Sequence, residues 1–187
     1  FAKQCKKSLK SLCPPPQPPL LSVQGGAGSG KSTVIEVITQ HMERIFRRPG
    51  DNPDSPYILK CAPTGTAAAN IGGLTLHSCL NFNFGANFLP LSDKKRDEKR
   101  NQFKHLKVII IDEFSMVSAD LLYKLDLRLK EITMKENLPF GGISIFCFGD
   151  LMQLKPVMAH FIFDEPIGQN FQLPFNIDPL WKKMKSI

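Results

Sequence analysis

The feature that most constrains the fold of this chain is a glycine-rich stretch, GGAGSGKST, at residues 25 to 33. The apolar run LLSV at residues 20 to 23 lies just before it, and a segment with apolar residues at helical spacing begins at its end, from residue 32 to residue 46. Glycine weakens regular elements because it loses more backbone freedom on folding than any other residue. This stretch therefore predicts a tight turn between a strand and a helix.

The same alternation of strand and helix continues along the chain. We expect strands at residues 57 to 62 (YILKCA), 108 to 111 (VIII) and 143 to 148 (ISIFCF). A short helix should follow the first of them, and a longer leucine-striped helix capped by Ser118 should follow the second. Near-continuous apolar strands alternating with helices predict an α/β fold, with a parallel sheet covered by helices on both faces.

We expect one folded domain over residues 20 to 187, preceded by a basic, proline-rich lead-in at residues 1 to 19. The segment from 82 to 107 is harder to assign. Its charge run, KKRDEKRNQFKHLK at residues 94 to 107, is interpreted as a solvated helix or loop.

Composition narrows the class of protein. The chain has a formal net charge of +7, which favours an anionic partner such as nucleic acid, and no apolar run is long enough to span a membrane. Its five cysteines are scattered, with no pair at metal-ligand spacing, which favours a reducing, intracellular environment. Cys147 lies inside an apolar run and is expected in the core.

The glycine-rich stretch fits the phosphate-loop pattern: glycine, any four residues, glycine, lysine and a hydroxyl residue. Backbone N–H groups in such a loop surround phosphate oxygens, and the following helix dipole favours negative charge. Lys31 is expected to reach the β- and γ-phosphates of ATP, and Ser32 to coordinate Mg²⁺. The predicted ATP-binding residues are Gly25, Gly26, Ala27, Gly28, Ser29, Gly30, Lys31, Ser32 and Thr33.

Two further motifs indicate hydrolysis of the nucleotide. The strand at 108 to 111 ends in Asp112 and Glu113; Asp112 is predicted to hold Mg²⁺ and Glu113 to polarise the attacking water as a general base. Gln153, in GDLMQLKPV, follows the strand at 143 to 148. That strand usually lies between the phosphate-loop strand and the Asp-Glu strand in sheets of this type, so Gln153 is predicted to sense the γ-phosphate.

Five segments, GGAGSGKST, APTGTAAANIGG, TLHS, IIIDEFSM and GDLMQLKPV, resemble in order and spacing motifs I, Ia, Ib, II and III of the PIF (petite integration frequency) helicases. These are 5′-to-3′ DNA helicases of superfamily 1, related to RecD and to the helicases of rolling-circle (Helitron-type) transposons. The resemblance implies a RecA-like P-loop NTPase fold, ATP with Mg²⁺, and translocation along single-stranded DNA toward duplex junctions. It also implies roles in DNA repair, recombination and telomere maintenance.

The resemblance also implies contacts to the DNA backbone. By motif position they fall on Thr64, Gly65, Thr66, His77 and Ser78. Hydroxyls and amides at a helix start are good phosphate ligands. A buried histidine bonded to the backbone is the alternative for His77. Trp181 is expected to be a packing anchor rather than a platform for base stacking.

The chain departs from the family pattern in three ways. Lys155 stands where the family usually has a proline, no counterpart of the adenine-reading glutamine motif is found in residues 1 to 19, and motifs IV to VI are absent. The second RecA-like lobe with its arginine fingers is therefore expected elsewhere, so this is the first motor lobe only. A transposon-derived remnant that binds nucleotide or nucleic acid without turnover is the alternative, and a replication-initiator ATPase a more distant one. We expect the nucleus rather than the cytoplasm, with the mitochondrion as another possibility.

Overall fold

The computed structural model describes residues 17 to 82, 88 to 153, 156, 161 to 162 and 180 to 186. The first half contains β1 (Leu20–Gln24), α2 (Lys31–Phe46), β2 (Ile58–Ala62), α3 (Gly65–Asn70), β3 (Leu74–Thr75), α4 (Leu76–Leu80) and α5 (Asp93–Gln102). The second half contains β4 (Val108–Ile111), η1 (Phe114–Met116), α6 (Ala119–Thr133), η2 (Pro139–Gly142), β5 (Ser144–Gly149), η3 (Leu180–Lys183) and β6 (Lys185–Ser186). Residues 1 to 16 of the basic, proline-rich lead-in and Lys155 lie outside the described residues.

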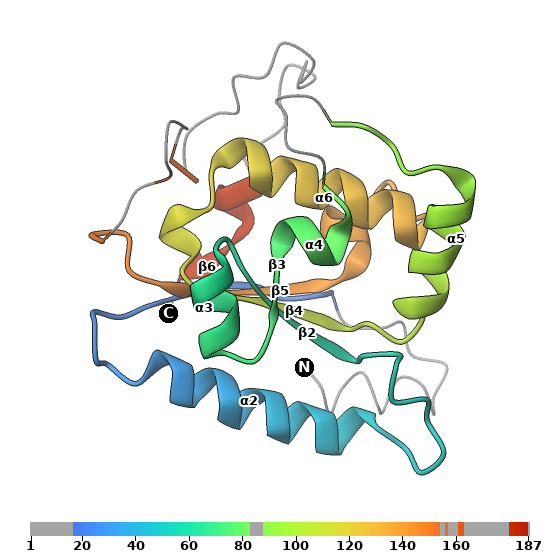
Figure 1. The fold of residues 1–187 in the computed structure, drawn as a ribbon. Coiled ribbons are helices and arrows are strands. Elements are labelled where there is room, and N and C mark those ends of the chain that lie inside the picture. The colour runs from blue at the N-terminus through green and yellow to red at the C-terminus, as the bar shows by residue number, and fades with distance from the viewer. Residues whose placement is uncertain (1–16, 83–87, 154–155, 157–160, 163–179, 187) are drawn as a thin grey trace.

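The strands form one sheet in the order β3-β2-β4-β5-β1-β6, and every pairing is parallel (Figure 1). Strand β5 lies between β1 and β4, as the sequence predicted, with Gln24 opposite Gly149 and Ile111 opposite Cys147. The carboxyl ends of β1, β4 and β5 therefore meet at one edge, where the glycine-rich loop and Asp112 also lie. This confirms the predicted α/β class.

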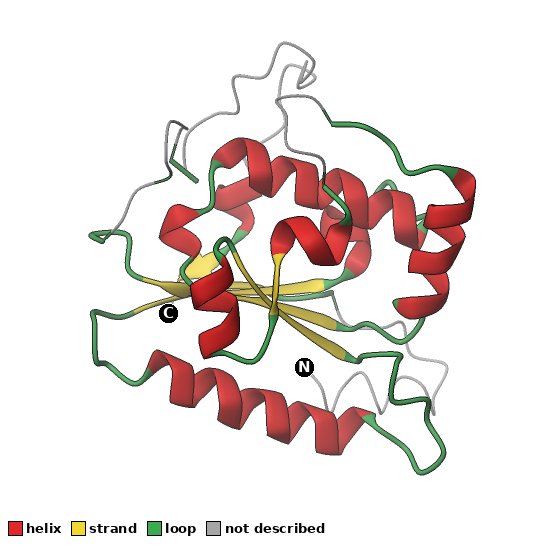
Figure 2. Ribbon diagram, viewed as in Figure 1, coloured by secondary structure: helices red, strands yellow, loops and turns green. Residues whose placement is uncertain are grey.

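Helices cover both faces of the sheet, as Figure 2 shows, with α2 on one side and α5 and α6 on the other. The strand β4 is buried at every position and contributes side chains to the two hydrophobic clusters on the two faces of the sheet. Val108 and Ile110 pack with the cluster under α2, which includes Ile35 and Phe46. On the other face, Ile109 and Ile111 pack with a larger cluster that contains Cys147 and the leucines of α6.

The ends of the helices follow the expected chemistry. Ser118 caps α6, because its Oγ accepts a hydrogen bond from the N–H of Leu121 at 3.1 Å. The charge run becomes helical as α5, in which no residue is buried, so it is a solvated helix. Among the described residues, no helix has the length and apolar character that crossing a membrane requires.

Candidate nucleotide and DNA-binding site

The glycine-rich loop needs its glycines for two physical reasons. Gly28 and Gly30 have φ angles of +73° and +85°, in the left-handed region that residues with a Cβ rarely adopt. A Cβ on Gly25 would lie 2.6 Å from Oγ of Ser29, so the Ser29 side chain would have to move. The N–H of Gly25 also donates to the carbonyl of Gly149 at 3.0 Å, so the loop starts firmly attached to the end of β5.

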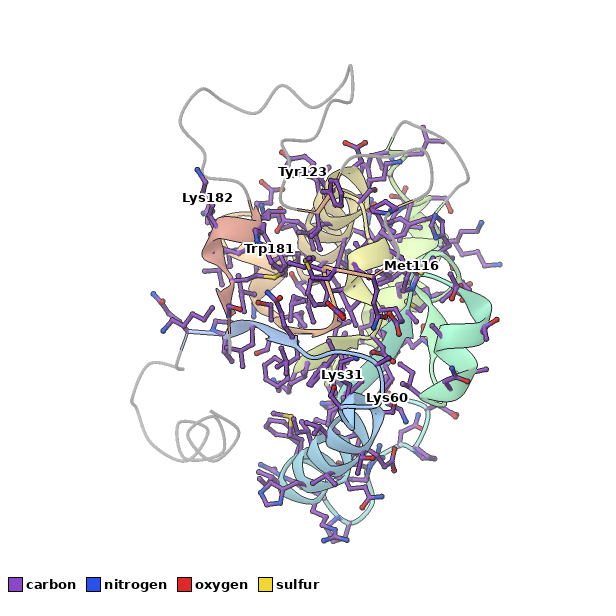
Figure 3. The ribbon with its side chains drawn as sticks, turned by 90° about the vertical axis from the view of Figure 1, so that its left-hand side faces the viewer. Lys31, Lys60, Met116, Tyr123, Trp181 and Lys182 are labelled. Carbon is purple, nitrogen blue, oxygen red and sulfur yellow. The ribbon has the colours of Figure 1, made fainter. Side chains whose placement is uncertain are left out.

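Lys31 holds this loop closed with its own side chain. The ammonium Nζ donates to the carbonyl oxygens of Gly25 at 2.6 Å and Gly26 at 2.9 Å. Figure 3 shows Lys31 where the loop after β1 enters α2. The positive charge thus already lies in the concavity of the loop, where phosphate oxygens could take the place of the two carbonyls.

A cavity of about 400 Å³ gathers most of the predicted ATP and catalytic residues. It is lined by Ala27, Gly28, Ser29, Gly30, Lys31, Ser32, Thr33, Asp112, Glu113 and Gln153. These residues come from the ends of β1, β4 and β5 and from the start of α2. Gly25 and Gly26 are not among the lining residues; their carbonyls hold Lys31 instead.

Asp112 is a buried carboxylate at the end of β4, with 5% of its surface exposed. Its N–H donates to the carbonyl of Cys61 at 2.9 Å, and its Oδ1 accepts from the N–H of Glu113 at 3.0 Å. Burial raises the pKa of Asp112, while the bond from Glu113 and the charge of Lys31 oppose that rise. A cation beside this carboxylate would compensate its desolvation.

The donor set suits Mg²⁺, which binds protein oxygens together with substrate phosphates and water. Asp112 supplies a carboxylate and Ser32 a hydroxyl, and both line the same cavity. These two residues are the ones that could hold the ion.

Glu113 turns the chain sharply after β4. Its φ of +51° lies in the left-handed region, which is uncommon for a residue with a side chain and is typical of functional sites. The turn leads directly into η1 and leaves Glu113 half-buried on the wall of the cavity. The sequence motif predicted the residue at this position but not its backbone conformation.

Gln153 reaches the cavity from a turn after β5. Its N–H donates to the carbonyl of Asp150 at 3.0 Å, and Oδ1 of Asp150 accepts from the N–H of Met152 at 2.9 Å. Sequence reasoning gave Asp150 no role. It is a positioning residue for Gln153, and the signal was present in the GD pair that ends the strand.

The predicted DNA-contacting residues lie in the short helices α3 and α4, directly after β2 and β3, at the same edge of the sheet. Thr64 caps α3, with Oγ1 accepting from the N–H of Ala67 at 3.3 Å, while Gly65 and Thr66 are exposed. Ser78 is exposed at the start of α4, next to β3. Since β3 pairs with β2, the structure brings the two groups to neighbouring strand ends.

His77 is half-buried and lies edge-to-face against the ring of Phe82, with centroids 6.0 Å apart. Burial lowers its pKa, and the charge of Lys124 lowers it further, which favours a neutral imidazole near pH 7. A direct ionic contact with phosphate is therefore not expected from His77.

The predicted ATP-site residues and the predicted DNA-contacting residues are linked by a backbone hydrogen bond. The carbonyl of Cys61, three residues before Thr64, accepts the N–H of Asp112. Strands β2 and β4 thus connect the start of the predicted DNA-contacting segment to the predicted magnesium ligand.

Trp181 packs against the core rather than facing solvent. Its ring stacks on that of Phe114 at 5.5 Å between centroids and 26° between planes, and Phe114 is fully buried directly after Glu113. Figure 3 labels Trp181 at η3. The prediction of a packing anchor is confirmed.

The fold, with a phosphate loop between β1 and α2 and β5 between β1 and β4, defines a RecA-like lobe of the P-loop class. A family model described as "PIF1-like helicase" matches residues 13 to 187. The chain therefore belongs to the PIF1-like helicase family.

Relatives and solved structures agree with this assignment. The chain is 36% identical over 155 residues to the ATP-dependent DNA helicase PIF1 of Emericella nidulans, covering 81% of this chain and 19% of that protein. It is 36% identical over 139 residues to PIF1 of Saccharomyces cerevisiae, covering 71% and 15%. The chain thus spans less than a fifth of the length of these relatives.

The crystal structure of Pif1 helicase from Candida albicans superposes with a TM-score of 0.70 at 30% identity, covering 98% of this chain and 37% of that one. A Bacteroides Pif1 bound to ssDNA superposes with a TM-score of 0.60 at 34% identity, covering 83% and 33%. A Bacteroides Pif1 structure in complex with ADP-AlF3 and ssDNA is also similar, with a TM-score of 0.61 at 31% identity, covering 87% and 38%.

Proposed function

We propose that residues 20 to 187 form the first motor lobe of an ATP-dependent DNA helicase. With a second RecA-like lobe, it would hydrolyse ATP with Mg²⁺ to drive 5′-to-3′ translocation on single-stranded DNA and unwinding at duplex junctions. The observation that carries the proposal is the single cavity that contains Lys31, Asp112, Glu113 and Gln153. The relatives of this chain are named as ATP-dependent DNA helicases, which supports the proposal.

Each residue then has a defined task. Lys31 exchanges its carbonyl partners for the β- and γ-phosphates, and the amides of the loop surround the same oxygens. Asp112 and Ser32 hold Mg²⁺, which would neutralise charge developing on the phosphates. Glu113 accepts a proton from the attacking water, and Gln153 senses whether the γ-phosphate is present.

Coupling to DNA would run through the strand pair β2 and β4. A shift of Asp112 toward the metal would also move Cys61, because the carbonyl of Cys61 accepts a hydrogen bond from the N–H of Asp112. Cys61 is followed closely by Thr64, Gly65 and Thr66, the proposed contacts to the DNA backbone. This gives the nucleotide state a short path to the DNA surface.

The lobe would lack one catalytic element. In related nucleotide hydrolases an arginine finger contributes about 10³ to 10⁵ in rate. Lys31 is the only cation among the described residues that line the ATP cavity. Arg128 is buried elsewhere, paired with Glu131 at 2.5 Å.

The decisive experiment is a comparison of two variants in a Mg·ATP binding assay. Lys31→Ala should weaken binding about 10- to 100-fold, because a charge-assisted contact contributes about 1.5 to 3 kcal/mol. Glu113→Gln keeps the side-chain size and should bind ATP like the wild type. If Glu113→Gln lost as much affinity as Lys31→Ala, the role given to Glu113 would be wrong.

Steady-state ATPase, with and without single-stranded DNA, tests the missing finger. The 187-residue chain should show almost no stimulated turnover, and a chain that includes the second lobe should show it. Robust turnover by the short chain would place the finger within it or in another copy. Absence of turnover in both would favour a remnant that only binds nucleotide or nucleic acid.

The setting of this activity is part of the same proposal. A DNA helicase would work in the nucleus or, alternatively, in the mitochondrion, in DNA repair, recombination or telomere maintenance. Imaging of the tagged full-length protein tests the first point, and exclusion from both compartments would contradict it.

A further inference from the structure

A second cavity, of about 540 Å³, lies beside the proposed DNA contacts. His77 and Ser78 form part of its wall. The other lining residues are Thr75, Asn81, Phe82, Leu89, Pro90, Leu91, Ser92, Lys95 and Arg128. Its volume falls within the range of about 300 to 1,000 Å³ that small-ligand sites occupy. It has no part in the ATP site, with which it shares no lining residue.

One wall of this cavity is the start of helix α5. Ser92 is the N-cap of that helix, and its side chain makes no capping hydrogen bond. The first N–H groups of a helix have no partner within the helix and attract anions. Lys95, an exposed residue in the first turn, lines the cavity next to Ser92.

The lining of the cavity also contains a buried cation, Arg128. Arg128 is 1% exposed, and its Nε has no hydrogen-bond partner. Nη1 pairs with Glu131 at 2.5 Å, and Nη2 donates to the carbonyl of Leu89 at 2.9 Å. The guanidinium also lies 4.8 Å from the ring centroid of Phe88.

The nearby carboxylates leave the cavity positive. Glu131 is already paired with Arg128 and accepts the N–H of Leu91. Asp93, at the start of α5, pairs with Arg96. Lys95 forms no ion pair with a carboxylate of the described residues.

We propose that this cavity is a subsite for one nucleotide of the single strand that passes Thr66 and Ser78. Its phosphate faces Lys95 and the amino end of α5. The sugar and base lie along the apolar wall of Phe82 and Leu89 to Leu91, within reach of the Asn81 amide. The inference rests on the proposed DNA-binding function and adds Lys95, Ser92 and Asn81 to it.

Adjacent lysines provide a matched test with a fluorescent oligothymidylate. Lys95→Gln should reduce the slope of log affinity against log salt by about 0.7, and weaken binding about fivefold at 0.1 M salt. Lys94→Gln removes the same charge from an exposed residue that does not line the cavity, and should have a smaller effect on both quantities. Equal effects of the two variants would overturn the subsite.

A second pair controls for folding of α5. Asn and Asp are both good N-caps, so Ser92→Asn and Ser92→Asp should leave the helix intact. Only Ser92→Asp places a negative charge beside the phosphate, and it should bind the oligonucleotide at least threefold more weakly than Ser92→Asn. Equal affinities would contradict the subsite. Absence of binding by the wild type would instead reject the proposed DNA-binding function itself.

Discussion

The proposed ATP side and the proposed DNA side of this sheet edge differ in how their residues are held. At the ends of β1, β4 and β5 the key residues occupy unfavourable states: Asp112 is a buried carboxylate and Glu113 has a left-handed backbone. At the ends of β2 and β3, Thr64 and Thr75 act as helix caps in the structure itself. The comparison teaches that the proposed ATP side holds residues in states that lower stability, whereas on the proposed DNA side Thr64 would both cap a helix and contact DNA.

The largest effect should come from the turn between α3 and β3. A Cβ on Gly73 would lie 2.4 Å from the carbonyl oxygen of Lys60, an atom of the adjacent strand that cannot easily move. Gly73→Ala should lower the free energy of unfolding by about 2 to 4 kcal/mol. Gly65→Ala is the control, since a Cβ there meets nothing within 4 Å. Urea unfolding of both variants measures the difference, and equal stabilities would contradict the tight packing of this turn.

Next in size is the loss of a helix cap on each side of the comparison. Thr64→Ala and Ser118→Ala remove the caps of α3 and α6, and each should cost about 1 kcal/mol of stability. Affinity for single-stranded DNA should fall only in Thr64→Ala, because Ser118 has no proposed contact with DNA. A similar loss of DNA affinity in both variants would show that stability, and not contact, is responsible.

An effect of similar size but opposite sign is expected at Asp112. Its raised pKa means that folding favours the protonated form: this stabilisation is complete below the ordinary value of 3.8 and is lost as pH rises through the folded-state pKa. At neutral pH the buried negative charge therefore lowers the free energy of unfolding. Asp112→Asn removes this charge and should stabilise the nucleotide-free protein by about 1 kcal/mol.

This gain should appear as a rise in melting temperature of about 2 to 4 °C in a domain of this size. It should shrink as the pH is lowered through the raised pKa of Asp112, because the wild-type side chain then becomes protonated. Thermal unfolding at pH 7 and pH 4 checks both statements. A variant that is less stable than the wild type at pH 7 would show that the Asp112 carboxylate supports the fold.

Much of the fold was predictable because its signals are local. The buried strand VIII, the Ser118 cap and the glycine-rich turn each depend on a few neighbouring residues, and each was found where expected. The place of β5 between β1 and β4 followed from knowledge of sheets of this type. The convergence of Lys31, Asp112 and Gln153 on one cavity was predictable once that strand order was assumed.

Other features depended on contacts between distant segments, which a sequence pattern does not encode. The cavity beside α4 and the start of α5 needs Lys95 and Arg128, 33 positions apart, to come together in one lining. The charge run predicted a solvated helix, but not that its first turn borders a pocket.

The central claim is that one edge of the sheet carries two separable sites, and crossed binding measurements test it most directly. Affinities for Mg·ATP and for a single-stranded oligonucleotide should be measured on Lys31→Ala and on a Thr66→Ala, Ser78→Ala double variant. Lys31→Ala should lose ATP affinity and keep DNA affinity, and the double variant should do the reverse. If either variant, still folded, lost both affinities to the same extent, the division of this edge into an ATP side and a DNA side would be wrong.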